Sequence, residues 1–283
     1  MENNLTAQNG YKECPVENLL SLSSLYTFST QHFTDDYDFK GETHDFYEVV
    51  CVTDGKAGIT ADKNVYVLDA GQMILHPPGE FHAIWSDRGT SPETIIFSFR
   101  ADTFPEPEKR VFRLSHERLN EIKSIFRAAE DAFELEKHSV KRIKDGKTAR
   151  AAVVIKRLEV FLLGVFEDGK NGEHAEQYTG RSAENYIRIL SVMENGLSEA
   201  LSAGKIAELC NMSVPAVEKT VFRYAGCGVM AYYNGLRMQR AAELLSGGAS
   251  VKEAALSVGF SDQNYFSARF KKWSGTPPSA WKK

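Results

Sequence analysis

The chain has 283 residues, 42% of them hydrophobic and 25% charged, which is typical of globular proteins. This length exceeds what one compact all-α or all-β unit needs, so we expect two domains and a connector. The net charge of −4 is unevenly spread: residues 181–283 hold 13 Lys and Arg against 8 Asp and Glu, a charge of +5, which leaves −9 on the rest. A basic C-terminal region favours a polyanionic partner.

Membrane and secreted classes are excluded on sequence grounds. No apolar run approaches the roughly 20 residues that a membrane helix needs, and the polar N-terminus lacks a leader pattern. The four cysteines show neither C-x-x-C pairs nor zinc-ligand spacing, so we expect them to be reduced. These features predict a soluble, cytoplasmic protein.

Residues 22–101 are predicted to form several short strands of a barrel or sandwich. β-Branched and aromatic runs such as EVVCV and TIIFSF alternate with the turn signals TDG, DAG, PPG and DRG.

Two segments within this region resemble the motifs of the cupin barrels. The first motif of metal-binding cupins is G-x5-H-x-H-x3-E-x6-G, and here Glu42 and His44 stand in the H-x-H places, followed by Glu48 and Gly55. The second motif is matched by a series with the expected spacing, namely Gly71, Pro77, Gly79 and His82, with Ser86 in the Asn place. The resemblance implies a cupin-like barrel.

A polar pocket is expected in the mouth of this barrel. Period-2 alternation would place Glu42, His44, Phe46 and Glu48 on one inward face of a strand, with His82 opposite them. Because Glu42 replaces the first His ligand, our prediction is a small-molecule site without metal or other cofactor. The predicted effector-binding residues are Glu42, His44, Phe46, Glu48, His82 and Trp85. The aromatic rings would stack on a sugar face. The alternative role for the histidines is a structural hydrogen bond, and this is the role that we favour for His76.

Helical periodicity follows the strands. Residues 115–136 carry one apolar stripe behind Ser115 as N-cap, and residues 147–167 form a second helix that is apolar on more than one face. This excess of apolar surface predicts a homodimer through one of the two helices. The polar, glycine-containing stretch 167–182 is interpreted as a linker.

An internal repeat lies in the C-terminal region. IAELCNMS (206–213) and AALSVGFS (254–261) each place a small residue four positions before Asn211 or Gly259, which tolerate a tight helix-turn-helix corner. A serine, expected to cap the next helix, follows two positions later. The closing glycines, Gly226 and Gly275, repeat at 49 instead of 48, so the first unit is one residue shorter. A long helix over 232–248, ended by Gly247-Gly248, would join the units.

These segments resemble the AraC/XylS family of transcription regulators. GFSDQNYFSARFKKWSGTPPSAW (259–281) is similar to the second helix-turn-helix of that family, LRMQRAAELL to its connecting helix, and LSAGKIAELCNMSVPAVEKTVFRYAG to its first unit. One departure is Val221, which stands where the family usually has Phe, with Phe222 next to it. The resemblance covers about residues 180–283.

The resemblance implies which residues contact DNA. Base-reading positions fall on Pro215, Glu218 and Lys219 in the first unit, and on Gln263, Asn264, Ser267 and Ala268 in the second. Gln and Asn bond adenine edges, Lys suits guanine, and Glu accepts from cytosine. Contacts to phosphates are predicted for Arg223, Tyr265, Lys271 and Lys272. The alternative for each of these residues is a position on a solvated helix face that makes no contact with DNA.

The sequence therefore predicts an α+β chain of two domains: a cupin-like effector domain over 1–110, a helical linker and dimerisation region over 111–180, and an all-α double helix-turn-helix domain over 181–283. The predicted function is non-enzymatic: sequence-specific binding of double-stranded DNA and transcriptional activation in response to a sugar-like small molecule, with RNA polymerase as a further candidate partner. The alternatives are a metal-dependent cupin enzyme with a helical appendage, and a regulator that has lost its effector.

Overall fold

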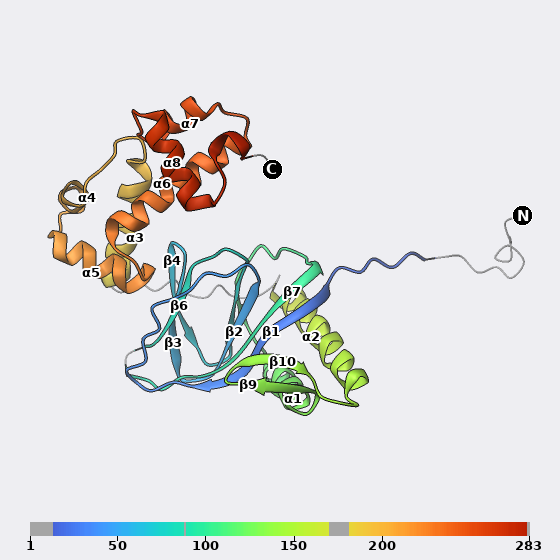
Figure 1. The fold of residues 1–283 in the computed structure, drawn as a ribbon. Coiled ribbons are helices and arrows are strands. Elements are labelled where there is room, and N and C mark those ends of the chain that lie inside the picture. Colours follow the sequence, from blue (N-terminus) through green and yellow to red (C-terminus); the bar gives the residue numbers. More distant parts are fainter. Residues whose placement is uncertain (1–13, 88, 170–180, 282–283) are drawn as a thin grey trace, which may run out of the picture.

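The structure is a computed structural model that describes residues 14–87, 89–169 and 181–281. A β-rich N-terminal domain with two long helices is followed by an all-helical C-terminal domain, which lies against one of the two β-sheets (Figure 1). The predicted α+β, two-domain fold class is confirmed. No helix within these described ranges is long and apolar enough to cross a bilayer.

Two antiparallel sheets build the N-terminal domain. The larger has the order β8-β5-β2-β7-β1-β10-β9 and the smaller β4-β3-β6. The strands of the larger sheet are β1 (Ser21–His32), β2 (Tyr47–Asp54), β5 (Gln72–His76), β7 (Glu93–Thr103), β8 (Val111–Arg113), β9 (Phe133–Glu136) and β10 (Ser139–Ile143). Those of the smaller sheet are β3 (Lys56–Ala61), β4 (Asn64–Asp69) and β6 (His82–Ser86).

Alternation along β2 divides the larger sheet into two faces. Val49 and Cys51 join the apolar cluster that includes the two long helices, whereas Val50 and Val52 join a second cluster with residues of the smaller sheet. Period 2 puts Glu48 on the same face as Val50, toward the space between the sheets. The polar end of β2 is thereby directed into the interior of the domain.

The two long helices cover the outer face of the larger sheet. Helix α1 (His116–Ala132) begins at the predicted N-cap, where the Ser115 side chain accepts a hydrogen bond from the backbone of Arg118, and α2 (Thr148–Gly169) packs beside it. The predicted helix over 115–136 is too long, because Phe133 begins β9.

The hairpin β9–β10 was also missed by the sequence prediction, which placed 111–180 in a helical linker. The strands pair with each other, and β10 pairs with β1 at the edge of the larger sheet. The turn between them carries a positive φ at Lys137. The available sequence signal for this hairpin was the strand-like alternation in FELE, which is a short and charged segment.

Six helices form the C-terminal domain: α3 (Arg181–Asn195), α4 (Ala203–Leu209), α5 (Val214–Ala225), α6 (Val229–Ser246), α7 (Val251–Ser257) and α8 (Gln263–Ser274), followed by a short 3₁₀ turn, Pro278–Ala280. Helices α4–α5 and α7–α8 are the two predicted helix-turn-helix units, and α6 joins them. Each unit has its own apolar core.

The corners of the two units have the predicted backbone. Asn211 has φ 51° and Gly259 φ 75°, and both second helices end at a left-handed glycine, Gly226 or Gly275. Both second helices have 12 residues. The extra residue of the second unit therefore lies before its recognition helix.

That extra residue changes the cap. Ser213 caps α5 as predicted, but α8 is capped by Asp262, whose side chain accepts from the backbone of Asn264 and Tyr265. The predicted cap, Ser261, is wrong: it lies one position outside, because the longer second unit starts its helix one residue later.

The core register of α5 follows the glycine spacing. Val221 is fully buried and Phe222 is 50% exposed. The apolar residue five positions before Gly226 therefore fills the core, and the neighbouring ring points outward.

Candidate functional site

A cavity of about 320 Å³ lies between the two sheets of the N-terminal domain. Its polar lining includes Glu48 on β2, His76 on β5, His82 on β6 and Glu42 in the segment that precedes β2. The remaining lining residues are Thr27, Gln31, Phe33, Tyr37, Phe39, Val50, Ile59, Ala83, Ile84, Ile96 and His138. This mixture of apolar walls and a few convergent polar groups is typical of a small-molecule site.

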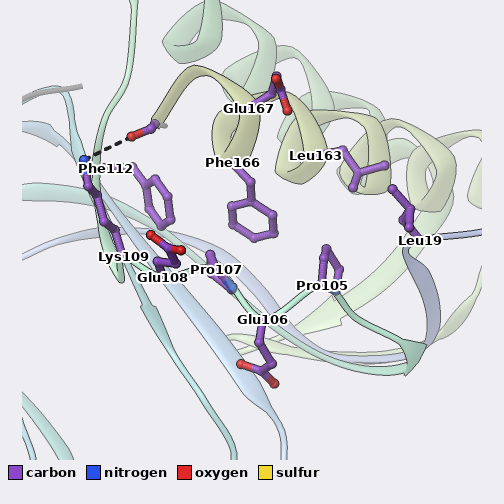
Figure 2. Close-up of a pocket in the computed structure, with 11 residues that line it drawn as sticks. Leu19, Pro105, Glu106, Pro107, Glu108, Lys109, Phe112, Leu163, Phe166 and Glu167 are labelled. Atoms are coloured by element: carbon purple, nitrogen blue, oxygen red, sulfur yellow. Dashed lines mark hydrogen bonds between the residues drawn. The ribbon is translucent and has the colours of Figure 1, made fainter. Parts of the chain in front are cut away.

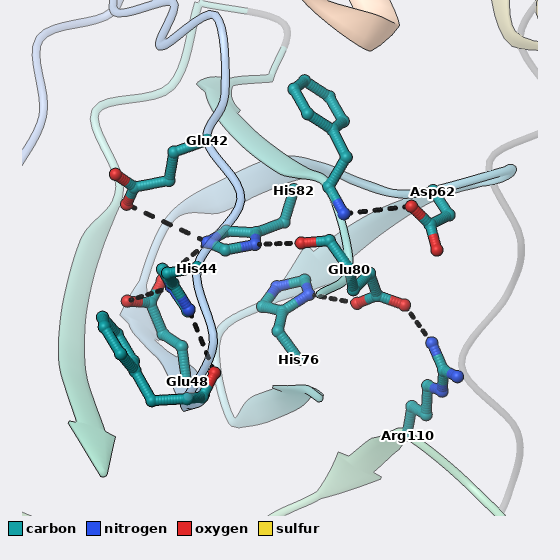
Figure 3. A network of polar contacts seen from close by, with 10 residues as sticks. Glu42, His44, Glu48, Asp62, His76, Glu80, His82 and Arg110 are labelled. Atoms are coloured by element: carbon teal, nitrogen blue, oxygen red, sulfur yellow. Dashed lines mark hydrogen bonds and ion pairs between the residues drawn. The ribbon is translucent and has the colours of Figure 1, made fainter. Parts of the chain in front are cut away.

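Four polar side chains meet at one end of the cavity (Figure 3). The Nε2 atom of His82 lies 3.3 Å from a carboxylate oxygen of Glu48 and 4.0 Å from one of Glu42, and the Nε2 atom of His44 lies 3.7 Å from the other oxygen of Glu48. Glu48 and His82 are buried, whereas the Glu42 side chain is about half exposed. The cluster thus reaches from the interior to the mouth of the cavity.

The titratable groups of this cluster shift one another's pKa values. Burial tends to raise the pKa of the Glu48 carboxyl, but the imidazoles of His44 and His82 outweigh it and lower that pKa to about 2. Burial tends to lower the pKa of His82, but the Glu48 carboxylate raises it above its ordinary value. Glu48 is therefore an anion at neutral pH.

A second network behind the cluster is structural in character. His76 Nδ1 lies 2.7 Å from Glu80, both side chains are almost fully buried, and Arg110 pairs with the other oxygen of Glu80 (Figure 3). Burial lowers the pKa of His76. This arrangement agrees with the structural interpretation of His76, whose ring stacks on that of His82 at 4.5 Å.

The sequence-predicted effector residues are only partly brought together. Glu42, Glu48 and His82 line the cavity, and His44 joins their cluster. The ring of Phe46 stacks on His44 at 3.8 Å and on Tyr26 at 4.1 Å, behind the cluster.

Two details of the predicted site are wrong. The expected continuous strand over 42–48 begins only at Tyr47, and Glu42 instead bridges to His82 through backbone hydrogen bonds. Trp85 does not line the cavity, because it points to the opposite side of β6 from Ile84 and packs on the C-terminal domain.

A second cavity, of about 390 Å³, lies outside the sheets, between α2 and the segment 105–109 (Figure 2). Phe112, Leu163 and Phe166 form its apolar wall, and Lys109 donates to the carbonyl of Gly169 across one end. Its three carboxylates, Glu106, Glu108 and Glu167, are all exposed. It lacks a convergent set of buried polar groups among the described residues, so we favour the inner cavity as the ligand site.

The second helices of the helix-turn-helix units carry most predicted DNA contacts on exposed positions. The exposed predicted residues are Pro215, Lys219, Arg223, Gln263, Asn264, Tyr265, Ala268, Lys271 and Lys272, while Glu218 and Ser267 are half-buried. Ser267 donates its hydroxyl to the carbonyl of Gln263 within α8. The N-terminal turn of α8 thus presents two amide side chains to solvent.

Two of the predicted contacts in α5 are engaged within the protein. A carboxylate oxygen of Glu218 accepts from the backbone of Val229, at the start of α6. The guanidinium of Arg223 lies 5.8 Å from the ring centre of Trp85 and 5.6 Å from that of Tyr224.

The contact between the two domains was not predicted from sequence. The Trp85 ring meets Tyr224 of α5 edge-on at 5.6 Å, and the Tyr186 hydroxyl of α3 donates to the carbonyl of Asp62. Lys63 pairs with Glu194 beside them. An aromatic residue at the end of a strand gives no sequence signal of which domain it faces, so this interface needed the structure.

One face of the ligand cavity therefore adjoins α5. The carbonyl of Lys40, two residues before Glu42, lies so close to Gly226 that an added Cβ there would approach it to 2.4 Å. The segment 38–42 separates the cavity from the first helix-turn-helix unit.

Two family models match parts of the chain. Residues 27–140 match the model of the AraC-like ligand binding domain, and residues 206–283 match the model of a helix-turn-helix domain. The first match begins within β1 and ends within β10, so it extends into the segment that the sequence prediction assigned to the linker.

Curated relatives span nearly the whole chain. The HTH-type transcriptional activator RhaS of Salmonella paratyphi A is 23% identical over 252 residues, which cover 83% of this chain and 86% of the relative. The HTH-type transcriptional activator RhaR of Mannheimia succiniciproducens is 22% identical over 273 residues, 93% of each chain.

Among solved structures, the C-terminal domain of AraT, a response regulator from Geobacillus stearothermophilus, is 28% identical over 36% of this chain and 86% of that chain, with a TM-score of 0.34. ToxT from Vibrio cholerae matches 92% of this chain and 97% of its own at 13% identity, with a TM-score of 0.36.

Proposed function

The chain belongs to the AraC/XylS family of transcription regulators with an N-terminal ligand-binding domain, and from this premise we propose that it binds DNA through α5 and α8 and activates transcription in response to a small molecule held in the inner cavity. The observation that carries the proposal is the repeated unit: two 12-residue helices, each behind a tight corner. The family assignment points to a regulator rather than to the alternative, a metal-dependent cupin enzyme. A bacterial-type transcription regulator binds chromosomal DNA, which lies in the cytoplasm. We therefore propose that the protein is cytoplasmic.

In the DNA complex, Gln263 and Asn264 read base edges and Lys271 and Lys272 hold phosphates. The two amides stand exposed in the first turn of α8, where recognition helices meet the major groove, and the two lysines stand exposed in its last turn. The remaining family positions, Pro215, Lys219, Ser267 and Ala268, complete the base contacts, and Tyr265 adds a phosphate contact.

Helix α5 joins the complex only after it leaves the N-terminal domain. Arg223 is engaged with Trp85, and the segment 38–42 touches Gly226. An effector that binds one arrangement of the domains better than the other shifts this equilibrium, and only that difference in affinity drives the response.

The effector class we propose is a sugar or a similar hydroxyl-rich metabolite. Glu42, Glu48 and His82 offer hydrogen-bond partners to hydroxyl groups, and Phe39 and Tyr37 supply aromatic surface in the same cavity. The sequence prediction assigned the stacking role to Phe46 and Trp85; Phe46 lies behind His44 and Trp85 lies at the domain interface.

We also propose a homodimer through α2, with RNA polymerase as the partner in activation. Val153 and Val160 lie seven residues apart on α2 and are 56% and 60% exposed, beside a shallow groove with Ala152 and Lys156. Two copies that shared this stripe would bury it. A protein that sediments as a monomer at micromolar concentration, or a dimer that Val160→Asp leaves unchanged, would contradict the proposed homodimer through α2.

The function is tested by fluorescence anisotropy of the full chain on fragments of the DNA upstream of its own gene, with unrelated DNA as the control. Binding should prefer the upstream DNA, weaken steeply with salt as phosphate contacts release counterions, and respond to the effector found in a sugar panel. Glu48→Ala should remove that response and leave affinity for DNA in the absence of effector within about twofold, because Glu48 lies in the inner cavity and its ion pairs are with His44 and His82 rather than with α5 or α8. Equal binding to all DNA at every salt concentration would contradict the proposal.

A further inference from the structure

The two recognition helices differ at the position that precedes their closing glycine by one helical turn. In α5 the backbone N–H of Gly226 donates to the carbonyl of Phe222. In α8 the backbone N–H of Gly275 donates to the carbonyl of Lys271. Phe222 and Lys271 are therefore structural equivalents. The first unit carries a phenyl ring where the second carries an ammonium group that we assign to a DNA phosphate.

Phe222 does not serve the core of its unit. Its side chain is 50% exposed, whereas the neighbouring Val221 is fully buried, and Phe222 lies outside the apolar cluster of the first unit. Single exposed apolar side chains are common on protein surfaces. The place of the ring on the helix therefore decides what it does.

Contact between the two domains does not account for the ring either. The next residue, Arg223, lies over Trp85, and Gly226 approaches the carbonyl of Lys40. Phe222 stays half exposed between these two contacts. The ring is thus available to a partner other than the N-terminal domain.

The ring shares the face of α5 that carries the proposed base-reading residues. The buried face consists of Val217, Thr220, Val221, Tyr224 and Ala225. At about 100° per residue, Phe222 lies about 20° around the helix from Pro215 and about 60° from Lys219. Pro215 and Lys219 are both exposed. A groove that receives these two side chains would also receive the phenyl ring.

One feature of the major groove suits a phenyl ring better than any other. Each base pair presents hydrogen-bond donors and acceptors there, and thymine adds an apolar C5 methyl group that Phe can contact. A phosphate would gain nothing from the ring, because phenylalanine has no donor to offer its oxygens. The chemistry of Phe222 therefore favours the thymine methyl group.

We propose that Phe222 recognises the methyl group of a thymine in the part of the DNA site that α5 contacts. The last turn of α5 then supplies one base contact beside the phosphate contact of Arg223, whereas the last turn of α8 supplies two phosphate contacts, Lys271 and Lys272. This inference rests on the proposed function, because it requires α5 in the major groove. It adds a residue that determines specificity and extends the sequence read by α5 by one position.

The test uses the full chain and a duplex that the chain selects from a random DNA pool. The block of bases read by α5 is the one whose preferences change in Lys219→Ala. Each thymine of that block is replaced in turn by deoxyuridine, which lacks only the methyl group. Anisotropy then compares wild type with Phe222→Ala at a fixed salt concentration, after circular dichroism has shown that the variant is folded.

Ile187→Ala is the matched control. Ile187 lies on α3 and is 40% exposed, so its substitution removes an exposed apolar side chain outside the recognition helices. We expect this variant to bind every duplex as wild type does.

At one thymine, deoxyuridine should weaken binding by wild type about 4-fold, which is the effect of losing one buried methyl group. Phe222→Ala should bind the unmodified duplex at least about 4-fold more weakly and should no longer distinguish thymine from deoxyuridine, so the two changes are not additive. Phe222→Lys recreates the phosphate contact of the second unit. It should lose the same preference and make the slope of log affinity against log salt steeper by about one.

The inference is overturned if no thymine of the block responds, or if deoxyuridine weakens wild type and Phe222→Ala equally. It is also overturned if Phe222→Ala keeps the affinity and preferences of wild type but loses activation in transcription assays, because the ring would then contact RNA polymerase. A pool without enrichment removes the proposed function and this inference together. Enrichment whose preferences are the same in Phe222→Ala removes this inference alone.

Discussion

Trp85→Ala should raise the affinity of the full chain for DNA in the absence of effector. The Trp85 ring is 5% exposed and lies over Gly58 on one side and against Tyr224 and Arg223 of α5 on the other. Removing it takes away the aromatic contact that holds the first helix-turn-helix unit on the N-terminal domain. Arg223 is then free to reach a phosphate.

The size of the effect follows from the two interactions that the substitution removes. An aromatic pair contributes about 0.5–1.5 kcal/mol, and an exposed cation–π interaction adds about 0.5–1 kcal/mol. Weakening the docked arrangement by about 1–2.5 kcal/mol changes its equilibrium with the undocked one by roughly 5- to 70-fold. Where docking limits binding, the apparent affinity for DNA rises by up to that factor.

Anisotropy with labelled upstream DNA measures this change at a fixed salt concentration, after circular dichroism has shown that the variant is folded. Phe104→Ala is the control, because its ring stacks on Tyr47 on the helix-covered side of the larger sheet. An affinity for DNA that falls in Trp85→Ala, or that rises equally in Phe104→Ala, would refute the role of the interface.

Two further predictions concern the helical domain. Asp262→Ala should lower the free energy of unfolding by about 1 kcal/mol in urea titrations, because it removes the N-cap of α8, whereas Ser261→Ala should change it by less than about 0.5 kcal/mol; the reverse order would restore the serine as the cap. Arg237→Met should destabilise by about 2–4 kcal/mol, since its buried guanidinium donates to the carbonyl of Val258 and lies 4.0 Å over the ring of Phe260. Arg240→Met, which breaks only an exposed pair, should cost less than about 1 kcal/mol, and equal losses would contradict the assignment.

Much of the helical domain could be predicted because its signals are local. Asn211 and Gly259 mark corners through the backbone that they alone tolerate cheaply, and the glycines that close α5 and α8 fix the lengths of those helices. The cap of α8 was misplaced because Ser261 and Asp262 are both good caps, and only the geometry of the longer second unit chooses between them.

The cavity cluster was predictable for a different reason. The spacing from Glu42 to Glu48 and the position of His82 follow a known barrel motif, so the sequence indicated that these residues meet, though not that 42–46 lies outside a strand. The contact of each Nδ1 with a backbone carbonyl orients the imidazole ring, so that Nε2 faces the cluster. The positions of these carbonyls cannot be inferred from the spacing of residues in the sequence.

The domain interface could not be predicted, because it depends on which side of β6 faces the partner domain. Trp85 and Ile84 are neighbours on one strand, yet one packs on α5 and the other lines the cavity. Aromatic character alone suits either place.

Selection from a random DNA pool by the full chain, followed by sequencing, would decide whether α5 and α8 read DNA. The selected sequences should contain base preferences in two blocks about one helical turn apart, roughly 10 base pairs, and Gln263→Ala or Asn264→Ala should each relax one position in the block read by α8, at a cost of about 1–3 kcal/mol. Lys272→Ala should weaken binding to all sequences alike and leave the preferences unchanged. A pool without enrichment, or the same preferences in wild type, Gln263→Ala and Asn264→Ala, would contradict the assignment of α8 as a base-reading helix.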